Sequence, residues 1–338
     1  MKFTSKQSDK IHALLNPLKT CCIIVHRNPD GDALGSSLGL KAYLKDAYSI
    51  DAQVIVPDDF PEFLNWMPQS SSILVAEKNP QLAKDFLQKA DLVFCLDFNH
   101  PSRVGELSES LVQSPAYKVM IDHHQNPDSF CDATWSETTA SSTCEMVTDW
   151  ILNDKGDLFL SADTAKCLYT GIMTDTGSFR FQATTAHTHQ LSAMLLSKGI
   201  NHWLIHESLM NQNTLQKLQL WGFALSNCLE VIPEYHTSFI YLSQENLIKY
   251  GYQEGDLEGL VNYALSIRGT RLAAVFSERK GKVRISFRSI GDFKVNELSG
   301  SYFSGGGHIN AAGGVSEESL DQAIIKFKSV LNQYPELK

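Results

Sequence analysis

Short apolar runs that end abruptly in polar residues are the feature that most constrains how this chain folds. The runs, each given with the polar segment that follows it, are residues 21–25 with 26–32, residues 92–96 with 97–100, and residues 119–121 with 122–124. Helical patterns at residues 38–44 and 142–152 follow the first and last runs, which indicates a parallel sheet with crossover helices. Ligands of such sheets bind beyond the carboxyl ends of the strands, so the chemistry is expected among these polar residues.

The sequence patterns in the first and second parts of the chain predict two different lobes. With 338 residues the chain is long enough for two domains, and residues 1–190 are predicted to form an α/β lobe whose parallel sheet carries helices on both faces. Residues 191–230 have a helical pattern and are predicted to form a connector. Residues 231–338 are predicted to form a smaller α/β lobe with a mixed sheet. Within it, residues 282–288 alternate strictly between polar and apolar side chains, as a half-buried strand does.

Composition and charge exclude several classes of protein. The chain is 43% hydrophobic and 20% charged, which is typical of a globular protein. No apolar stretch approaches the ~20 residues that span a bilayer, and the N-terminus lacks a signal-peptide core, so we expect a cytoplasmic protein without a membrane partner. A net charge of −9 opposes binding to long duplex nucleic acid. The seven cysteines have no C-x-x-C spacing and are expected to be reduced core residues.

Basic residues are concentrated in one segment of this acidic chain. Residues 261–290 contain seven lysines and arginines and one acidic residue. A local excess of positive charge attracts anions, so we expect this segment to bind an anionic ligand. A small substrate that carries phosphate is compatible with it.

Aspartate and histidine side chains at the predicted strand and helix ends indicate a metal centre. Asp30 and Asp32 flank Gly31 in a turn, so both carboxylates can point into one small volume. Four aspartates that lie close together would become protonated unless cations compensate their charge, which predicts two divalent ions. Mixed Asp and His donors favour Mn²⁺, with Mg²⁺ or Co²⁺ as alternatives. The six candidate ligands are His26, Asp30, Asp32, Asp97, His123 and Asp175.

Two neighbouring features allow more than one interpretation. The small residues of segment 33–39 start a helix whose N-terminus favours an anion. Asp175 can be a ligand or only a turn residue at the end of a helix, and its spacing alone does not decide between the two. The string Asp122-His123-His124 occurs often by chance, but its place after an apolar run, together with the other two polar segments, points to function.

These segments together resemble the motifs of the DHH phosphoesterase family. The motifs appear in the family's order as His26-Arg27-Asn28-Pro29-Asp30-Gly31-Asp32-Ala33, then Asp97, then Asp122-His123-His124, then Asp175. Residues 303–314 are similar to the glycine-rich signature of the DHH-associated domain, except that Ser304 stands where a fourth glycine is common. The compact two-lobe form is similar to the bacterial nano-RNase and 3′-phosphoadenosine-5′-phosphate (pAp) phosphatase group.

The resemblance implies a role for each residue of the first lobe. The ligands divide into two sets that share Asp97: His26, Asp30 and Asp97, and Asp32, Asp97, His123 and Asp175. Asp122 would orient its neighbours, and His124 would hydrogen-bond the scissile phosphate, either as a donor or as a general acid. A hydroxide activated by both ions would attack phosphorus in line.

The resemblance also implies substrate-binding residues. Backbone amides of Gly305, Gly306 and Gly307 can hold a phosphate, with charged donors from His308 and Arg288. A glycine run can also be only a flexible turn. Arg103 either reaches the substrate or braces the loop after Asp97, and both alternatives stay open.

The expected function follows from this family. It is a metal-dependent phosphoesterase that converts short oligoribonucleotides to nucleoside 5′-monophosphates, and pAp to AMP and phosphate. One alternative is a soluble phosphodiesterase for linear dinucleotides such as pApA or pGpG. Another is a nucleotide-binding protein without activity, which the complete ligand set disfavours. Short RNA and pAp are the expected partners, and a homodimer is left open.

Overall fold

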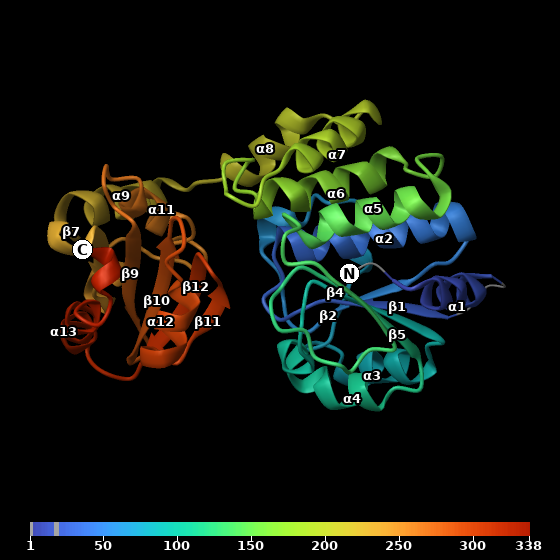
Figure 1. The fold of residues 1–338 in the computed structure, drawn as a ribbon, viewed down its shortest axis with the longest axis horizontal. Coiled ribbons are helices and arrows are strands. Elements are labelled where there is room, and N and C mark those ends of the chain that lie inside the picture. Colours follow the sequence, from blue (N-terminus) through green and yellow to red (C-terminus); the bar gives the residue numbers. More distant parts are fainter. Residues whose placement is uncertain (1–2, 17–19) are drawn as a thin grey trace. The chain divides into compact units, whose positions relative to one another are not determined.

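The computed structural model describes residues 3–16 and 20–338. It divides into two compact units, Met1–Gln212 and Asn213–Lys338, which Figure 1 shows as ribbons. The predicted connector, residues 191–230, spans this division, because α7 and α8 belong to the first unit and α9 belongs to the second. Each unit has its own sheet and core and is described by itself.

The first unit contains the predicted parallel sheet. Its strands are β1 (Cys21–Ile24), β2 (Gln53–Val56), β3 (Leu74–Val75), β4 (Leu92–Leu96), β5 (Tyr117–Asp122) and β6 (Ala133–Ser136). They lie in the order β3-β2-β1-β4-β5-β6, and every neighbouring pair is parallel. All residues of the central strands β1 and β4 are buried, because helices cover both faces of the sheet.

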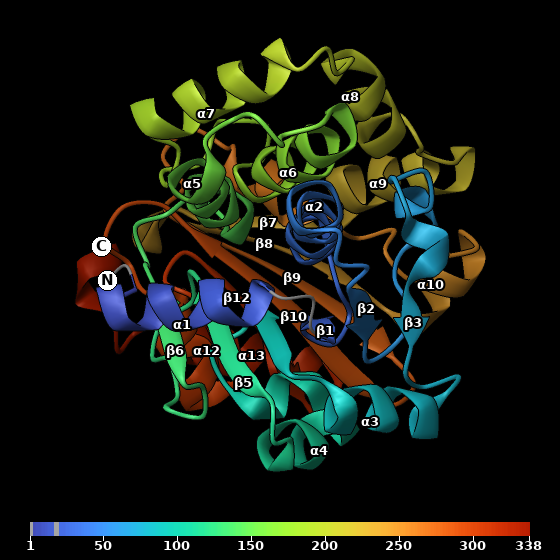
Figure 2. The same cartoon turned by 90° about the vertical axis from the view of Figure 1, so that its right-hand side faces the viewer.

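Helices pack on both faces of this sheet, as predicted. They are α1 (Ser5–Leu15), α2 (Gly31–Tyr48), α3 (Pro80–Lys89), α4 (Ser108–Gln113), α5 (Thr143–Lys155), α6 (Ala162–Asp175), α7 (Ala186–Ser197) and α8 (His202–Met210), with 3₁₀ turns at Glu62–Leu64, Ser70–Ser72 and Pro101–Leu107. Figure 2 shows α2, α5 and α6 above the sheet and α3 and α4 below it. Ile23 and Phe94 belong to the core under α2, α5 and α6, whereas Cys22 and Val93 belong to the core against α3 and α4.

Glycines bring α2 unusually close to α6. A Cβ atom on Gly35 of α2 would lie 2.6 Å from the carbonyl oxygen of Cys167 in α6. A Cβ atom on Gly171 of α6 would lie 2.8 Å from Oδ1 of Asp32. Real Cβ atoms do not approach so closely, so these positions require glycine. Gly35, one of the small residues of segment 33–39, therefore serves helix packing, which brings the start of α2 beside the end of α6.

The second unit has the predicted mixed sheet. Its strands are β7 (Leu229–Ile232), β8 (Thr237–Leu242), β9 (Leu272–Arg279), β10 (Lys282–Ser289), β11 (Gly306–His308) and β12 (Ala311–Ser316), in the order β11-β12-β10-β9-β8-β7. β8 and β9 are parallel, and the other neighbouring pairs are antiparallel. On β10 the apolar Val283, Ile285 and Phe287 are buried while the alternate side chains face outward, as the alternation predicts.

The helices of the second unit cover both faces of its sheet. They are α9 (Leu215–Asn227), α10 (Gln244–Lys249), α11 (Leu260–Leu265), α12 (Val295–Tyr302) and α13 (Leu320–Leu331), with 3₁₀ turns at Pro233–Tyr235 and Pro335–Leu337. One core joins Phe276 and Phe287 to α12 and α13, and the other joins Ala273 and Val275 to α9, α10 and α11. The basic strand β10 thus belongs to a sheet with a complete core of its own.

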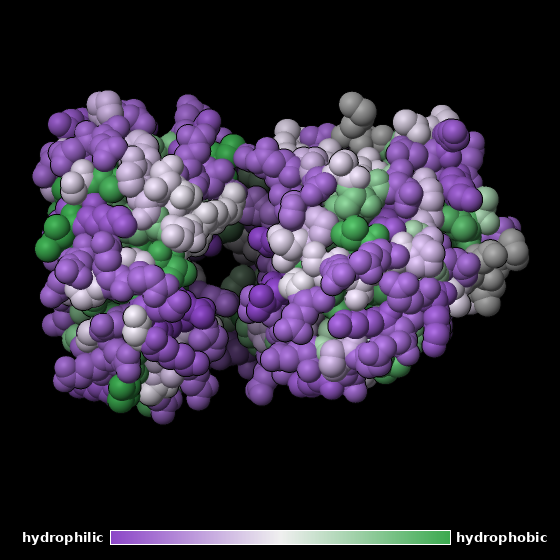
Figure 3. Space-filling model, turned by 90° about the horizontal axis from the view of Figure 1, so that it is seen from below, coloured by the Kyte–Doolittle hydropathy of each residue, from purple (hydrophilic) through white to green (hydrophobic). Residues whose placement is uncertain are grey.

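The helices, the surface and the cysteines of the structure match what the composition predicts for a globular protein. Within the described ranges, none of the helices has the length and apolar character that crossing a bilayer requires. Figure 3 shows a face on which hydrophilic residues predominate and hydrophobic residues form small separate groups. All seven cysteines are free, and every one except the half-buried Cys131 is buried.

Candidate metal centre

The segment after β1 places His26 and Asp30. His26 is 5% exposed, and its Nδ1 lies 2.7 Å from the carbonyl oxygen of Arg27. A carbonyl can only accept, so Nδ1 carries the proton and Nε2 presents its lone pair. Asp30 caps α2, because its Oδ1 accepts hydrogen bonds from the amides of Asp32 and Ala33. The anion at the start of this helix is therefore a carboxylate of the protein itself.

Asp97 lies between two groups of candidate ligands. It follows β4 directly and is 2% exposed. Its Oδ2 is 3.3 Å from Nε2 of His26, and its Oδ1 is 3.6 Å from Nε2 of His123. The backbone of Asp97 has a φ of 64°, a left-handed conformation that is strained for most side chains and is typical of functional sites. Each oxygen of one carboxylate thus faces a different histidine.

Asp32, His123 and Asp175 form the second group. Nε2 of His123 lies 3.4 Å from Oδ2 of Asp175 and 4.0 Å from Oδ2 of Asp32. Nδ1 of His123 faces the carbonyl oxygen of Ala140 at 3.3 Å, so this ring also donates through Nδ1 and presents Nε2. Asp32 comes from the first turn of α2, and Asp175 is the last residue of α6. The close packing of these two helices brings the group together.

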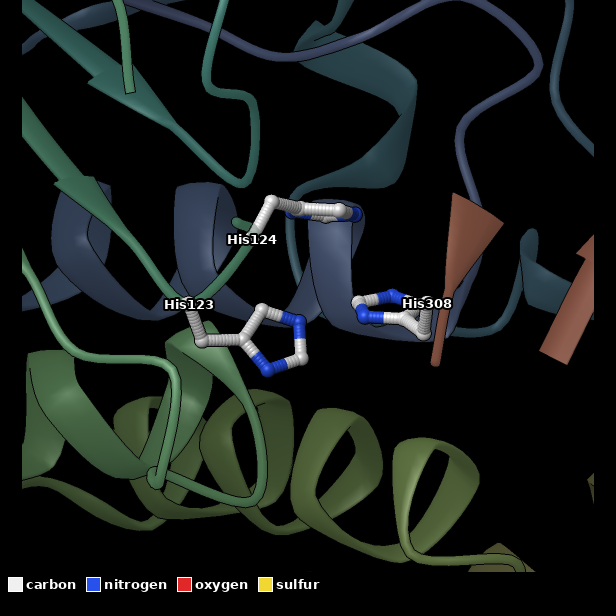
Figure 4. Close-up of side chains that lie close together, drawn as sticks. All are labelled: His123, His124 and His308. Carbon is white, nitrogen blue, oxygen red and sulfur yellow. The ribbon is translucent and has the colours of Figure 1, made fainter. Parts of the chain in front are cut away.

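Asp122 orients His124. Oδ1 of the fully buried Asp122 lies 2.7 Å from Nδ1 of His124, and its Oδ2 accepts a hydrogen bond from the His124 amide. Figure 4 shows His123 and His124 side by side at the end of β5, with their rings turned 76° apart. The His124 ring presents its Nε2 away from Asp122. This geometry supports the predicted orienting role of Asp122, and the action of His124 on a phosphate stays a prediction.

Crowding changes the proton affinity of the site. Burial, together with the charge of neighbouring Asp32, raises the pKa of Asp97 well above its usual range. Burial likewise raises the pKa of Asp32, and that of Asp175 to about 8. For His123, burial alone would lower the pKa, but Asp175, Asp97 and Asp32 raise it to about 9. Without a cation, Asp175 therefore retains its proton near neutral pH.

The donor set fits divalent metal ions. The ligand atoms of His26, Asp30 and Asp97 lie within 4.8 Å of one another, and so do those of Asp32, His123 and Asp175. Metal–ligand bonds of about 2.0–2.2 Å place the neighbouring ligands of one ion roughly 3–4 Å apart, which matches the distances given above. Two dications would also offset the carboxylate charge that raises these pKa values. The assignment of each residue to one ion is a proposal.

The glycine run has a packing reason in the second unit. It ends in the edge strand β11, where His308, labelled in Figure 4, pairs with Ala311 of β12. A Cβ atom on Gly305 would lie 1.9 Å from the Gly313 carbonyl oxygen, and one on Gly307 would lie 2.4 Å from that of Ala311. Gly306 alone of the three faces open space. Close backbone packing thus explains two of these glycines, and phosphate binding by the run stays a prediction.

Two arginines and Ser304 complete the residues predicted to contact the substrate or its binding loop. Arg288 is half-buried on β10, and its Nη1 donates to the carbonyl oxygen of Phe287. Arg103 has an exposed side chain, and its carbonyl oxygen accepts a hydrogen bond from the amide of Arg27. This backbone bond braces the segment after β1, and contact between the Arg103 side chain and a substrate stays a prediction. Ser304 has a φ of 46°, which explains why a glycine suits its position.

Comparison with known proteins decides the family. The model of the DHH family N-terminal domain matches residues 20–172, and the DHHA1 domain model matches residues 235–334. The bifunctional oligoribonuclease and PAP phosphatase NrnA of Thermus thermophilus is 30% identical over 89% of this chain and 86% of the relative. The chain belongs to the DHH family of phosphoesterases.

Other relatives agree with this DHH assignment. NrnA of Bacillus subtilis, which carries the same name, is 29% identical over 89% of this chain and 91% of the relative. The crystal structure of an exopolyphosphatase-related protein from Bacteroides fragilis is 37% identical, with a TM-score of 0.95 over 99% of this chain and 98% of that one. A cyclic-di-AMP phosphodiesterase, GdpP of Geobacillus thermodenitrificans, is 27% identical over 92% of this chain but only 47% of the relative.

Sequence reasoning found the start of α5 but missed its contact with the candidate metal centre. Ser142 caps the helix, and Glu145 stands three residues later, so the helix start itself is visible in the sequence. Thr143, the first residue of α5, contacts both Asp32 and Asp97. Nothing in the local pattern shows in which direction a helix points, so this contact required the tertiary structure.

The metal-free DHH protein is expected to lose stability as the pH rises from about 6 to about 9. The folded state holds protons on Asp175 and His123, whose pKa values are raised to about 8 and about 9, that the unfolded chain, with ordinary pKa values of about 3.9 and 6.5, has released. Each extra proton lowers the free energy of unfolding by up to about 1.4 kcal/mol per pH unit. Urea unfolding in EDTA measures this slope.

Saturating Mn²⁺ provides the comparison for this pH series. Because metal binding displaces protons from its ligands, Mn²⁺ should stabilise the protein more at high pH than at low pH. An unfolding free energy in EDTA that rises with pH over the same range would contradict the raised pKa values.

Proposed function

We propose that this chain hydrolyses short oligoribonucleotides to nucleoside 5′-monophosphates, and pAp to AMP and phosphate, with divalent metal ions. Relatives named for both activities match about nine tenths of the chain, which supports the proposal. The observation that carries it is the placement of Asp97, whose two oxygens face His26 and His123 respectively. A carboxylate in this position suits a pair of ions that act on one phosphate.

One chemical step accounts for both activities. In each substrate the bond between phosphorus and the ribose 3′ oxygen breaks, while a bond between phosphorus and a water oxygen forms. Metal ions, when bound, supply a nucleophilic water at neutral pH and offset the charge that develops on phosphorus. Within the chain, His26, Asp97 and His123 would hold the ions, and Asp122 holds His124 in a fixed orientation. His124 would give a proton to the departing 3′ oxygen.

The second unit would bind the anionic part of the substrate. The outward face of β10 carries Lys282, Arg284 and Arg288, and His308 lies on the edge strand of the same sheet. Arg284 already pairs with Glu254 at 3.3 Å, so an anion there would replace an internal carboxylate. The positive charge that is concentrated on this face of an otherwise acidic chain would attract the phosphate groups of the substrate.

A substrate panel tests the proposal. We expect turnover of pAp and of an RNA dimer that stops when EDTA removes the metal and returns when Mn²⁺ is added. The same rates measured with Mg²⁺ and with Co²⁺ show which of the three ions supports the highest activity. Products are identified as AMP and nucleoside 5′-monophosphates by chromatography. RNA from two to ten nucleotides long gives the length preference. Absence of turnover with every metal, combined with tight nucleotide binding in calorimetry, would instead favour the inactive binding protein.

A phosphodiesterase for linear dinucleotides is the second candidate. Its support is the likeness to GdpP, which is named a cyclic-di-AMP phosphodiesterase and of which this chain matches about half. The same panel includes pApA and pGpG. Hydrolysis of these dinucleotides without turnover of pAp would favour the second candidate over the first.

A further inference from the structure

The N-terminus of α5 contacts two carboxylates of the candidate metal centre. The amides of Thr143 and Cys144 donate to Oδ2 and Oδ1 of Asp32, at 2.7 and 2.9 Å. The Thr143 hydroxyl donates to Oδ1 of Asp97 at 3.0 Å. Thr143 itself is fully buried. One residue therefore connects a carboxylate of α2 to the carboxylate that follows β4.

The start of α5 is held in place by contacts other than these carboxylates. The Ser142 hydroxyl accepts a hydrogen bond from the Glu145 amide at 3.0 Å and caps the helix. The buried Glu145 carboxylate accepts hydrogen bonds from the hydroxyls of Ser141 and Thr188, both at 2.6 Å. The helix start is thus a rigid support, and the carboxylates take their orientation from it.

The donors of α5 favour ionised carboxylates. Amides in the first turn of a helix have no partner inside the helix, and they carry the positive end of its dipole. Both oxygens of Asp32 accept hydrogen bonds from these amides, and such bonds are strongest to a charged carboxylate. A carboxylate oxygen that accepts one hydrogen bond keeps a second lone pair for a cation. These contacts therefore prepare the carboxylates for metal without occupying them.

We infer that Thr143 is a positioning residue for the metal centre, whose hydroxyl fixes the rotation of the Asp97 carboxylate while its amide fixes Asp32. The inference rests on the proposed function, since it concerns the same metal ligands. Removal of the hydroxyl frees Oδ1 of Asp97 to turn away from His123, which lies 3.6 Å from it. Because Asp97 faces both ligand groups, this rotation would weaken the binding of both ions.

The test compares Thr143→Val with Thr143→Ser in the full chain. Valine keeps the shape and loses the hydroxyl, whereas serine keeps the hydroxyl. Partners of metal ligands typically contribute 10–100-fold to metal affinity, so T143V is expected to bind Mn²⁺ about 10–100-fold more weakly, and T143S within about threefold of the unchanged chain. Free Mn²⁺ is measured by electron paramagnetic resonance, a readout independent of catalysis. With pAp, T143V should lower kcat and leave KM unchanged.

Thr148→Val is the matched control. Thr148 is also a fully buried threonine of α5, but its hydroxyl donates to the carbonyl oxygen of Cys144 and not to a carboxylate. T148V is expected to bind Mn²⁺ like the unchanged chain. Circular dichroism in EDTA shows whether each variant is folded, and T143A, which adds no bulk, replaces T143V if the latter is not.

The outcomes separate this inference from the proposed function. If T143V binds Mn²⁺ as tightly as the unchanged chain, or if T143S is as weak as T143V, the positioning role of the hydroxyl is overturned and the proposed function is not. If the unchanged chain itself binds no Mn²⁺, the proposed function fails first and the inference fails with it.

Discussion

Asp97→Asn is expected to lower the turnover number for pAp and for RNA dimers by about 1000-fold or more. Asparagine offers one neutral oxygen where the carboxylate presents an oxygen to each ligand group, so neither ion would be held with its full charge compensation. A loss of about 4 kcal/mol of transition-state stabilisation corresponds to this factor. Rates are measured at saturating Mn²⁺ with each substrate.

The fold of D97N is expected to survive. Asparagine tolerates the left-handed backbone that Asp97 adopts, and the substitution removes one charge from a crowded buried group. The unfolding free energy in EDTA should therefore equal or exceed that of the unchanged chain. Asp157→Asn, at a side chain that is 65% exposed, is the matched control and should retain full activity. Undiminished turnover by D97N would remove Asp97 from the metal centre.

Gly35→Ala is expected to destabilise the first unit by about 2–3 kcal/mol, the upper part of the range for overpacked cores. The new Cβ would lie 2.6 Å from the backbone oxygen of Cys167 and 2.8 Å from Sγ of Cys144. Backbone atoms cannot rotate away, so α2 must move off α6. Asp32 begins one of these helices and Asp175 ends the other, and we therefore expect weaker Mn²⁺ binding as well.

Gly222→Ala is the matched control for this substitution. Gly222 is also a glycine inside a helix, α9, but a Cβ atom there would meet nothing within 4 Å. Because alanine favours a helix over glycine, G222A should stabilise the protein by about 0.5–1 kcal/mol. Thermal and urea unfolding of both variants give the difference. A G35A protein as stable as G222A would show that the contact between α2 and α6 adapts easily.

The fold could be predicted where one local pattern was strong. β1, β4 and β5 lie at the apolar runs, and β10 follows the alternation of residues 282–288. Burial on both faces makes a strand apolar throughout, and burial on one face makes it alternate, so both kinds of strand are visible in one segment. The two-residue strand β3 has no comparable pattern, since its pairing with β2 is decided by the neighbouring strand.

The candidate ligands could also be predicted, but the contacts that hold them could not. Asp97 and His123 come directly after β4 and β5, and His26 is the second residue after β1. All three lie at one edge of a parallel sheet, which is why a search of strand ends finds them. The anion site at segment 33–39 stays a prediction, whereas the packing of its Gly35 and Gly39 against α6 became visible only in the structure. The sequence likewise gave no sign that Thr143 reaches two carboxylates.

The amino-acid sequence by itself determined the kind of sheet, the two lobes, the family and the residue types at the candidate metal centre. These properties depend on the order of residues within short segments, where periodicity and strand ends are directly visible. Only the tertiary structure decided that Gly35 and Gly171 bring α2 against α6, that Asp97 faces two histidines, and that α5 points at the carboxylates. Those facts depend on distances between residues far apart in the chain, which are set by how whole helices pack.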